Sequence, residues 1–499
     1  MKEKEVREPE REVMEVRGAW CRPPVEWGGQ ARALVFFGPR DFRVVRGRTM
    51  LGMDRDIVAR VELVHRCGTD ACIFREGRVE PLERVLIEEL HELIGFRGDL
   101  GERTGPLARL FLDGVPEGVP AEVVDYWRSL SEEKREQLRR ALLLSWGRVL
   151  GHEFCARIVH VGSAVGKLTE GIGYLEGKPV PTDFHVGQRI TVQTRVAHYR
   201  APFGVRRDRA DVAGVQLAGR DIANMAMTSD GAYAEYVRLT PAFIASGSVI
   251  PVPEEIDPVE AALVEPAACL LDCLQKGTHE VAQGPNGALH KKGVMPDGVT
   301  CVMGSGSMAL LAGRFALSDP QQIEVGGARR AVFVVRSEDK ADLVRKILGA
   351  DRVEVVIIPK GAGADQIVQA VSEQYGPRHS ARDGEPFRGF DDIVIAAPGK
   401  ELLPAAAELV GVGGRIFAFA GFTGRVEMEG GVWHYRSAGV IGSSGCNTRM
   451  MEIVLEYLVQ GRLQLRDLSG RKYRLSELAP DPAVFFEDRY MRPCLIPGE

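Results

Sequence analysis

The sequence predicts an α/β protein in which a doubly wound domain with a parallel sheet is joined to a β-rich domain. From about residue 265, short apolar runs alternate with helical patterns, beginning with TCVMG, SMALLAGRFAL, AVFVV and KADLVRKILGA. Runs this continuous suit strands that are buried on both faces, and the helices between them supply the crossovers that a parallel sheet requires. A chain of 499 residues is also too long for one ordinary hydrophobic core.

The first half of the chain has a different pattern. Apolar runs broken by turns predict strands from Arg32 to about Asp70, and strands return after Gly151 in ARIVHVG, QRITVQT and AYAEYVRL. Between them, LERVLIEELHELIG and the segment from Ser129 to Trp146 have the apolar spacing of helices. We therefore expect four segments: a charged N-terminal extension at 1–31, a β-rich domain at 32–266 with a helical insertion at about 76–146, the doubly wound domain at 267–442, and a C-terminal return to the β-rich domain at 443–499.

Composition excludes several functional classes. The net charge is -5, and no basic block could neutralise a run of phosphates, so nucleic acid is not expected as a partner. Nine cysteines without the spacing of a disulfide scaffold fit a reducing cytoplasm. The first 17 residues carry 11 charges, which excludes a signal peptide, and the apolar stretch from Thr300 contains a Gly/Ser turn that argues against a membrane span.

A glycine-rich turn in VTCVMGSGSMA predicts a nucleotide site. Gly304 and Gly306 follow an apolar strand and open a helix, and Ala309 stands where a third glycine often lies. Glycines let the backbone approach a pyrophosphate, which the exposed N–H groups and the positive dipole of the helix then bind. Such a turn can be purely structural, but the further strand–helix units favour cofactor binding. The expected cofactor-binding residues are Gly304, Ser305, Gly306, Ser307, Met308 and Arg336.

Arg336 bears on the choice of cofactor. It ends the second strand, AVFVV, at the position where an acidic residue usually holds the ribose hydroxyls of NAD. An arginine there can pair with a 2'-phosphate, which favours NADP(H) over NAD(H). Two alternatives stay open: Arg336 is a solvated residue at the end of a strand, or Glu338 or Asp339 reaches a ribose.

Three residues offer a thiolate, an imidazole and a carboxylate, which is a catalytic zinc set. Cys67 stands in HRCGTD after a strand, and His152 and Glu153 stand in GHE before another. Taken singly, a cysteine is more often a small buried hydrophobe, and a His-Glu pair is more often satisfied by hydrogen bonds. A second hypothesis is a non-catalytic nucleotide-binding or redox-sensing protein in which Cys67 and Cys72 form a thiol pair.

The order CGTD, GHE, Glu265 in ALVEPAACLLDCL and GSGSMA resembles the zinc-containing medium-chain dehydrogenases, in particular the sorbitol, threonine and sugar-phosphate dehydrogenase branch. The resemblance covers about residues 32–75 and 147–490. It implies a GroES-like catalytic domain and a Rossmann coenzyme-binding domain. The implied reaction is hydride transfer between NAD(P)(H) and a secondary alcohol, which is a polyol, a sugar or a sugar phosphate, or its carbonyl.

The resemblance also implies roles for single residues. Cys67, His152 and Glu153 match the family's zinc ligands, and Glu265 matches a fourth, exchangeable ligand. Thr69 matches the hydroxyl that hydrogen-bonds the reacting oxygen.

The resemblance also bears on Asp70, on Cys72 and on the number of zinc ions. Asp70 matches the carboxylate that orients the histidine ligand, whereas Cys72 replaces a histidine that serves many relatives in proton transfer. Residues 190–230 lack the four cysteines of a structural zinc, so we expect one zinc per chain. The family also implies a homodimer or homotetramer.

Overall fold

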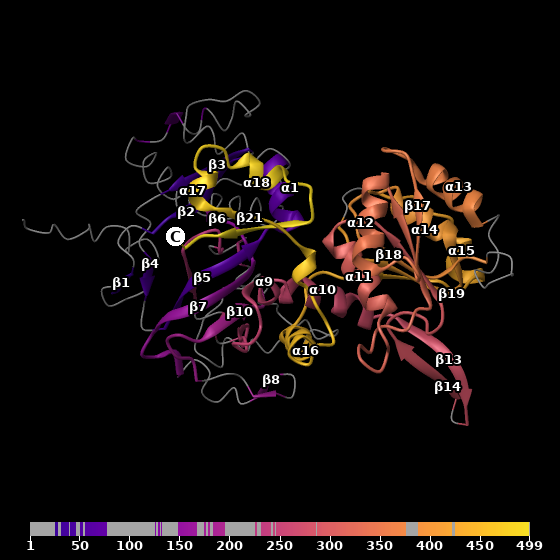
Figure 1. Ribbon diagram of the computed structural model, residues 1–499, viewed down its shortest axis with the longest axis horizontal. Helices are drawn as coiled ribbons and strands as arrows, with labels where there is room; N and C mark the ends of the chain where they lie inside the picture. The colour runs from indigo at the N-terminus through magenta and orange to yellow at the C-terminus, as the bar shows by residue number, and fades with distance from the viewer. Residues whose placement is uncertain are drawn as a thin grey trace, which may run out of the picture.

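The described part of the chain forms two bodies, one built on a mixed sheet and one on a parallel sheet (Figure 1). The computed structural model describes residues 25–27, 31–38, 40–45, 50–52, 55–76, 125, 128–129, 131, 148–166, 174–175, 178–179, 183–194, 225–226, 231–240, 243–244, 246–285, 287–375, 388–421 and 425–498. The predicted helical insertion at 76–146 and the charged extension at 1–31 lie almost wholly outside these residues.

The parallel sheet has six strands in the order β17-β16-β15-β18-β19-β20, and every pair is parallel. In chain order this reads third, second, first, fourth, fifth and sixth, the arrangement of a dinucleotide-binding fold whose order reverses between β15 and β18. The strands are β15 (Val299–Met303), β16 (Arg330–Val335), β17 (Val353–Ile357), β18 (Phe390–Ile395), β19 (Val410–Ala418) and β20 (Gly439–Gly442).

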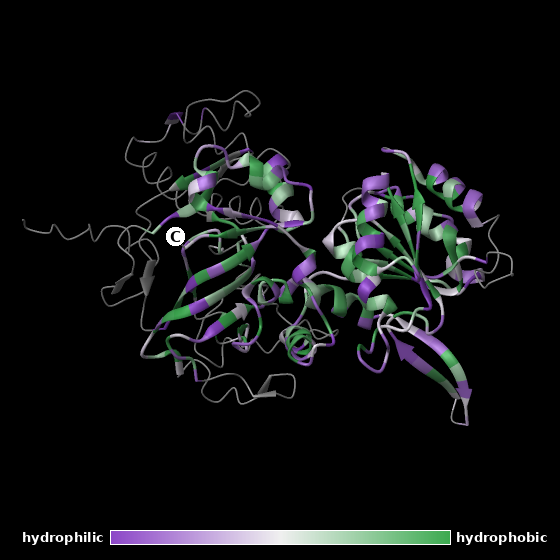
Figure 2. Cartoon of the chain, viewed as in Figure 1, coloured by the Kyte–Doolittle hydropathy of each residue, from purple (hydrophilic) through white to green (hydrophobic). Residues whose placement is uncertain are grey.

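Helices cover both faces of this sheet, and its central strands are mostly green in the hydropathy view (Figure 2). All five residues of β15 are buried, as expected for a strand in the middle of a layered domain. The helices are α11 (Ser307–Leu317), α12 (Glu338–Leu348), α13 (Ala364–Tyr375), α14 (Leu402–Leu409) and α15 (Gly431–Tyr435).

The mixed sheet has seven strands in the order β12-β10-β7-β5-β22-β21, and β11 also pairs with β5. Its last two strands come from the C-terminal end of the chain, so this segment returns to the first body, as predicted. The strands are β5 (Ile57–His65), β7 (Glu153–Val161), β10 (Arg189–Val192), β11 (Tyr236–Leu239), β12 (Val249–Pro251), β21 (Ser469–Arg474) and β22 (Arg492–Ile496).

Short elements surround this sheet. A three-stranded sheet joins β3 (Asp41–Val45), β2 (Ala33–Gly38) and β6 (Arg148–Val149), and two small pairs join β1 (Val25–Trp27) with β4 (Met50–Gly52) and β8 (Tyr174–Leu175) with β9 (Lys178–Pro179). The helical elements are α1 (Gly68–Glu76), α9 (Pro258–Ala261), α17 (Leu475–Leu478), α18 (Ala483–Glu487) and the 3-10 turn at Arg466–Leu468.

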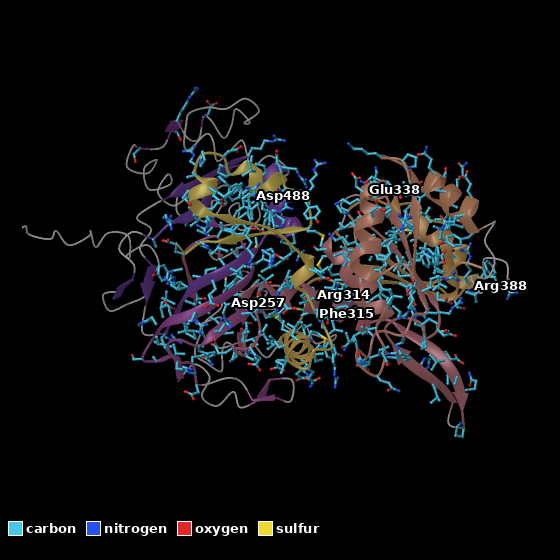
Figure 3. All side chains as sticks on the ribbon, in the orientation of Figure 1. Asp257, Arg314, Phe315, Glu338, Arg388 and Asp488 are labelled. Atoms are coloured by element: carbon cyan, nitrogen blue, oxygen red, sulfur yellow. The ribbon has the colours of Figure 1, made fainter. Side chains whose placement is uncertain are left out.

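Two helices and a salt bridge connect the bodies. Helices α10 (Val264–Gln275) and α16 (Thr448–Val459) lie between the two sheets (Figure 1). Arg314, labelled on α11 in Figure 3, pairs with Asp467 across 2.6 Å, which ties the Rossmann side to the C-terminal segment. The predicted domain boundary at 266/267 falls inside α10.

A hairpin that the sequence analysis did not predict follows α10. Strands β13 (Thr278–Gly284) and β14 (Gly287–Lys292) pair only with each other among the described strands, and they extend away from the parallel sheet (Figure 1). The base of the hairpin is fixed where the His279 ring lies 2.8 Å from the buried Asp392 carboxylate.

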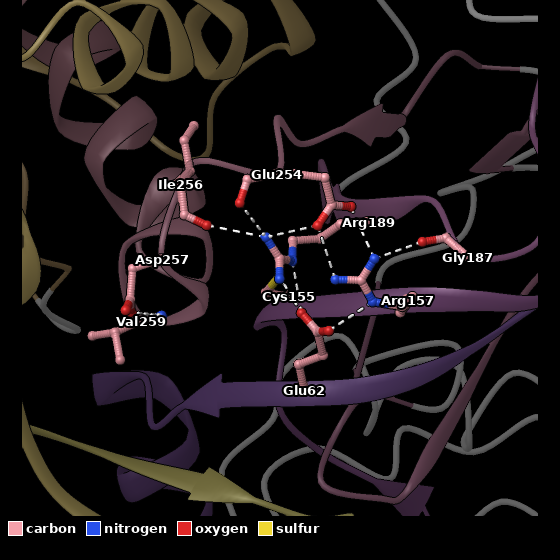
Figure 4. A network of polar contacts seen from close by, with 9 residues as sticks. All are labelled: Glu62, Cys155, Arg157, Gly187, Arg189, Glu254, Ile256, Asp257 and Val259. Atoms are coloured by element: carbon pink, nitrogen blue, oxygen red, sulfur yellow. Dashed lines mark hydrogen bonds and ion pairs between the residues drawn. The ribbon is translucent and has the colours of Figure 1, made fainter.

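An ion-pair network holds the segment before α9 against the mixed sheet (Figure 4). Glu62 of β5 accepts from Arg157 Nε at 2.9 Å and from Arg189 Nε at 2.7 Å. Arg157 also donates to Glu254 at 2.8 Å, and Arg189 to the Ile256 carbonyl at 3.1 Å. Three neighbouring strands and the chain that leads to α10 are thereby joined.

The fold class predicted from the sequence, a GroES-like β-rich domain with a Rossmann domain, is confirmed by this architecture and by the solved structures compared below. None of the described helices is both long and apolar enough to cross a membrane.

Candidate active site

Strand pairing brings the Cys67 and His152 segments together. In the antiparallel pair of β5 and β7, His65 lies opposite Glu153. Cys67 follows β5 by two residues, and His152 directly precedes β7. Two motifs that are 85 residues apart in the sequence therefore meet at one end of the mixed sheet.

Gly151 has to be a glycine for two reasons. Its φ is +88°, a backbone region that other residues rarely adopt, and a Cβ there would lie 2.5 Å from the ring of Tyr233. The close approach lets the Tyr233 hydroxyl donate to Asp70 Oδ2 at 2.6 Å. Sequence reasoning assigned no role to Tyr233, although it lies in the run AYAEYVRL that predicted a strand.

The ligand atoms of Cys67, His152 and Glu153 all lie within 4.8 Å of one another. Asp70 Oδ1 lies 3.6 Å from His152 Nδ1, and Asp70 Oδ2 accepts from the Cys67 backbone N–H at 3.0 Å. An imidazole that faces a carboxylate with Nδ1 has Nε2 available for a cation. The donor set and its orientation therefore fit a zinc ion with an open position.

Buried charges surround the three residues. Arg492 of β22 donates to Glu153 Oε2 at 2.8 Å, and both side chains are buried. A carboxylate that accepts from an arginine with one oxygen keeps its second oxygen for another partner. Sequence reasoning did not find Arg492, because nothing in MRPCLIPGE marks this residue as the partner of Glu153.

The pKa shifts in this cluster follow from burial and from these neighbours. Burial raises the pKa of the Cys67 thiol and of the Glu153 carboxyl, although Arg492 acts in the opposite direction on Glu153. Burial lowers the pKa of His152, but the charges of Cys67 and Asp70 outweigh this and leave it well above its usual value. A divalent cation would favour the ionised thiol and carboxylate, as well as the neutral imidazole.

Glu265 belongs to a different group of side chains. It lies in the first turn of α10, buried, and its carboxylate accepts from Thr194 Oγ1 at 3.1 Å. Its oxygen, Cys269 Sγ and Cys446 Sγ lie within 4.8 Å of one another. The charge of Glu265 still raises the pKa values of Glu153 and Arg492, so the two groups are electrostatic neighbours.

Thr69 and Cys72 both lie on α1, the helix that begins directly after Cys67. Thr69 is exposed in the first turn, and Cys72 is half-buried one turn further along. The grouping of Cys67 with His152 and Glu153 favours its role as a metal ligand over the alternative of a thiol pair with Cys72.

The predicted nucleotide turn lies at the point where the strand order of the parallel sheet reverses. Gly304 follows β15 with a φ of +141°, and a Cβ there would lie 3.3 Å from the Ala396 backbone, which follows β18. Gly306 is the N-cap of α11, and a Cβ there would meet open space. An open backbone at a helix N-terminus suits a pyrophosphate.

The other predicted cofactor residues surround this turn. Ser307 and Met308 begin α11, and Ser305 lies between the two glycines. Arg336 directly follows β16, with about half of its side chain exposed, and its Nη2 lies 3.3 Å from Glu401 Oε1. The guanidinium is thus held near the end of β16.

Curated proteins with similar sequences are sugar and polyol oxidoreductases. The chain is 24% identical over 325 residues to L-sorbose 1-phosphate reductase of Klebsiella pneumoniae, covering 63% of this chain and 65% of that protein. It is 21% identical over 335 residues to L-galactonate-5-dehydrogenase of Escherichia coli K12, covering 67% and 78%. The alignment thus spans less than two thirds of the sorbose phosphate reductase. No family model matches the chain.

Solved structures share the fold. A zinc-binding dehydrogenase of Sinorhizobium meliloti 1021 bound to NADP superposes with a TM-score of 0.59 and 18% identity, over 94% of this chain and 100% of that one. Galactitol-1-phosphate dehydrogenase of Escherichia coli gives a TM-score of 0.57 and 15% identity, over 93% and 100%. Together with the sequence relatives, these structures confirm the predicted resemblance to the sugar and polyol branch.

Proposed function

We propose that this chain belongs to the zinc-containing medium-chain dehydrogenases and is a zinc-dependent oxidoreductase that interconverts a secondary alcohol and its carbonyl. The observation that carries the proposal is the grouping of Cys67, His152 and Glu153 within 4.8 Å, with Asp70 beside the histidine. The substrate class is a polyol, a sugar or a sugar phosphate, in keeping with the names of the relatives.

Zinc, when bound, supplies Lewis-acid polarisation of the substrate oxygen, and the nicotinamide supplies or accepts the hydride. Cys67, His152 and Glu153 would hold the metal, and the role of Glu265 as a fourth, exchangeable ligand stays a prediction. Asp70, whose carboxylate faces His152 Nδ1, would orient the imidazole, and Arg492 compensates the charge of Glu153.

Thr69 is the side chain that we propose hydrogen-bonds the reacting oxygen. It is exposed and lies two residues from Cys67, at the start of α1, so its hydroxyl is accessible to a small molecule beside the metal ligands. Cys72 is a poor proton carrier at neutral pH because a thiol titrates well above that pH. Protons would therefore leave through the Thr69 hydroxyl, the cofactor ribose or water.

The cofactor is NADP(H) in preference to NAD(H). The turn from Gly304 to Met308 would hold the pyrophosphate. The strand order and the turn are those of a Rossmann domain, in which the residue after the second strand lies beside the ribose of the cofactor. Arg336 would therefore face a 2'-phosphate. Glu401 accepts from the same guanidinium, so the arginine is already oriented toward this edge.

Assembly and location stay predictions. The family resemblance implies a homodimer or homotetramer, and the cysteine content fits the cytoplasm.

The proposed activity can be tested with the purified full-length chain loaded with zinc. Oxidation of NADPH would be followed with ketoses, their phosphate esters and keto-acids of sugars, and reduction of NADP+ with the matching alcohols. We expect turnover with at least one sugar-derived substrate in the wild type and none in Cys67→Ser. A folded, zinc-loaded protein that transfers hydride to no carbonyl and from no alcohol with either nicotinamide would contradict the proposal.

A further inference from the structure

We propose that Glu265, Cys269 and Cys446 form a second metal site, separate from the Cys67 group, that binds one thiophilic divalent cation such as Zn²⁺. Their ligand atoms lie within 4.8 Å of one another. Two thiolates and a carboxylate are ligands that zinc and cadmium accept and that magnesium does not select. The proposal goes beyond the activity proposed above and revises two expectations: one zinc per chain, and Glu265 as a fourth ligand of the zinc held by the Cys67 group.

The distance between the ligand atoms of Glu265 and Cys269 matches a tetrahedral ion. Around zinc, with Zn–S near 2.3 Å and Zn–O near 2.0–2.2 Å, neighbouring ligand atoms lie about 3.5–3.8 Å apart. The distance from Cys269 Sγ to Glu265 Oε1 is 3.5 Å. Cys269 and Cys446 are also within hydrogen-bonding reach of each other, so the two sulfur atoms are already neighbours.

The chain holds each ligand in place from outside the cluster. Glu265 and Cys269 are one turn apart on α10, and Thr194 donates to the Glu265 carboxylate. Cys446 lies in the loop before α16, where its backbone carbonyl accepts from Gln193 Nε2 at 2.9 Å. Such supporting contacts orient ligands before an ion binds.

A second set of contacts fixes the same loop to α10. Lys276 donates to Ser443 Oγ at 2.8 Å, and Ser443 in turn donates to Asp272 at 3.2 Å. Asn447, next to Cys446, caps α16 by accepting from the Met450 N–H at 2.9 Å. The loop is therefore fixed on both sides of Cys446.

The site connects segments of both bodies. Helix α10 leads into the Rossmann sheet, the loop with Cys446 follows its last strand, and Thr194 and Gln193 follow β10 of the mixed sheet. An ion there would link α10 and the Cys446 loop by direct bonds, and the mixed sheet through the hydrogen bonds of Thr194 and Gln193. Cys269 and Cys446 are only half-buried, which leaves a route for the ion to enter. Binding releases the two thiol protons to solvent.

The first test is metal content. The full-length chain would be reduced, treated with a chelator, dialysed against Zn²⁺ and freed of excess metal, and zinc per chain would then be measured. We expect two equivalents in the wild type and one each in Cys269→Ser, Cys446→Ser and Cys67→Ser. The matched control is Cys273→Ala, one turn further on α10 and outside the cluster, which should keep two equivalents.

Thermal unfolding separates this site from the proposed active site. Zn²⁺, but not Mg²⁺, should raise the unfolding midpoint of Cys67→Ser, because an ion bound only by the folded state stabilises it. The same addition should have no effect on a Cys67→Ser/Cys446→Ser double variant. The proposal would be overturned if the wild type, Cys269→Ser and Cys446→Ser each bound one equivalent of zinc. It would also be overturned if Cys269 and Cys446 formed a disulfide that the reducing treatment does not break.

Discussion

Arg492 and Glu153 form a buried ion pair across 2.8 Å although 339 residues separate them in the sequence. The arginine opens the last strand of the mixed sheet, and the glutamate opens the strand that carries the zinc motif. The C-terminal segment therefore supplies a positive charge that favours the ionised form of a buried carboxylate in the candidate active site.

The first prediction concerns Arg492→Met. Removing one member of a buried pair leaves an uncompensated charge, which costs about 3–5 kcal/mol. We expect the free energy of unfolding to fall by that order in chelator-treated protein and by less in zinc-loaded protein, where the metal would compensate Glu153. Urea unfolding of both forms measures the difference. An equal loss in both forms would mean that Glu153 does not face the metal.

The second prediction concerns Asp70→Asn. The amide can still accept from the Cys67 N–H, but it has lost the charge that faces His152 Nδ1. We expect zinc affinity to fall roughly 10- to 100-fold, measured by competition with a chelator. Tyr233→Phe keeps the carboxylate and removes only its hydroxyl donor, so its effect should be smaller. Unchanged zinc affinity in Asp70→Asn would refute the orienting role.

The third prediction concerns Arg336→Ala. Hydrogen bonds to charged groups contribute about 1.5–3 kcal/mol, so NADPH affinity should fall roughly 10- to 100-fold while NADH affinity stays within about twofold. Titration calorimetry with both nucleotides checks this. Glu401→Gln, which removes the negative charge that now faces the arginine, should not weaken NADPH binding. An equal loss of affinity for NADPH and NADH would mean that Arg336 supports the fold and does not recognise the 2'-phosphate.

The sequence predicted those parts of the molecule whose signals are local. The alternation of apolar strands and helices after residue 265 predicted the parallel sheet, and the turn at Gly304 and Gly306 lies between β15 and α11. The metal group could also be predicted, because Cys67 and His152 each adjoin a predicted strand and these two strands pair with each other. In each case a residue's neighbours in the chain carried the information.

Features that depend on distant partners were missed. Arg492 has no local mark of its role, since its partner lies on another strand. Cys446 and Cys269 meet only after α10 and the loop before α16 have packed together. The β13–β14 hairpin did have a signal, the run Gly-Pro-Asn-Gly in GPNGALH, because these residue types are common in turns.

The fourth prediction concerns pH and Glu62. Burial raises the pKa of Glu62, but hydrogen bonds and charges from Arg189 and Arg157 lower it below its usual value of 4.5. A carboxyl whose pKa is depressed on folding stabilises the protein above its unfolded pKa, and that contribution is lost as the pH falls through the folded pKa. The relevant window therefore lies below about pH 4.5.

Glu62→Gln should consequently lower the free energy of unfolding at pH 7 by roughly 1–3 kcal/mol. The difference from the wild type should shrink as the pH drops below about 4.5. Urea unfolding at a series of pH values measures both. Glu254→Gln, at the exposed end of the same network, should have little effect. A difference between wild type and Glu62→Gln that is independent of pH would contradict the ionic role of Glu62.

The central claim, that zinc held by Cys67, His152 and Glu153 is required for hydride transfer, is tested most directly by restoring metal to chelator-treated protein. NADPH oxidation with the best carbonyl substrate would be measured as Zn²⁺ is added to the wild type and to Cys67→Ser. We predict that the metal-free wild type is inactive and regains activity with zinc, whereas Cys67→Ser stays inactive at every zinc concentration. Full activity in wild-type protein shown to contain no metal would contradict the claim.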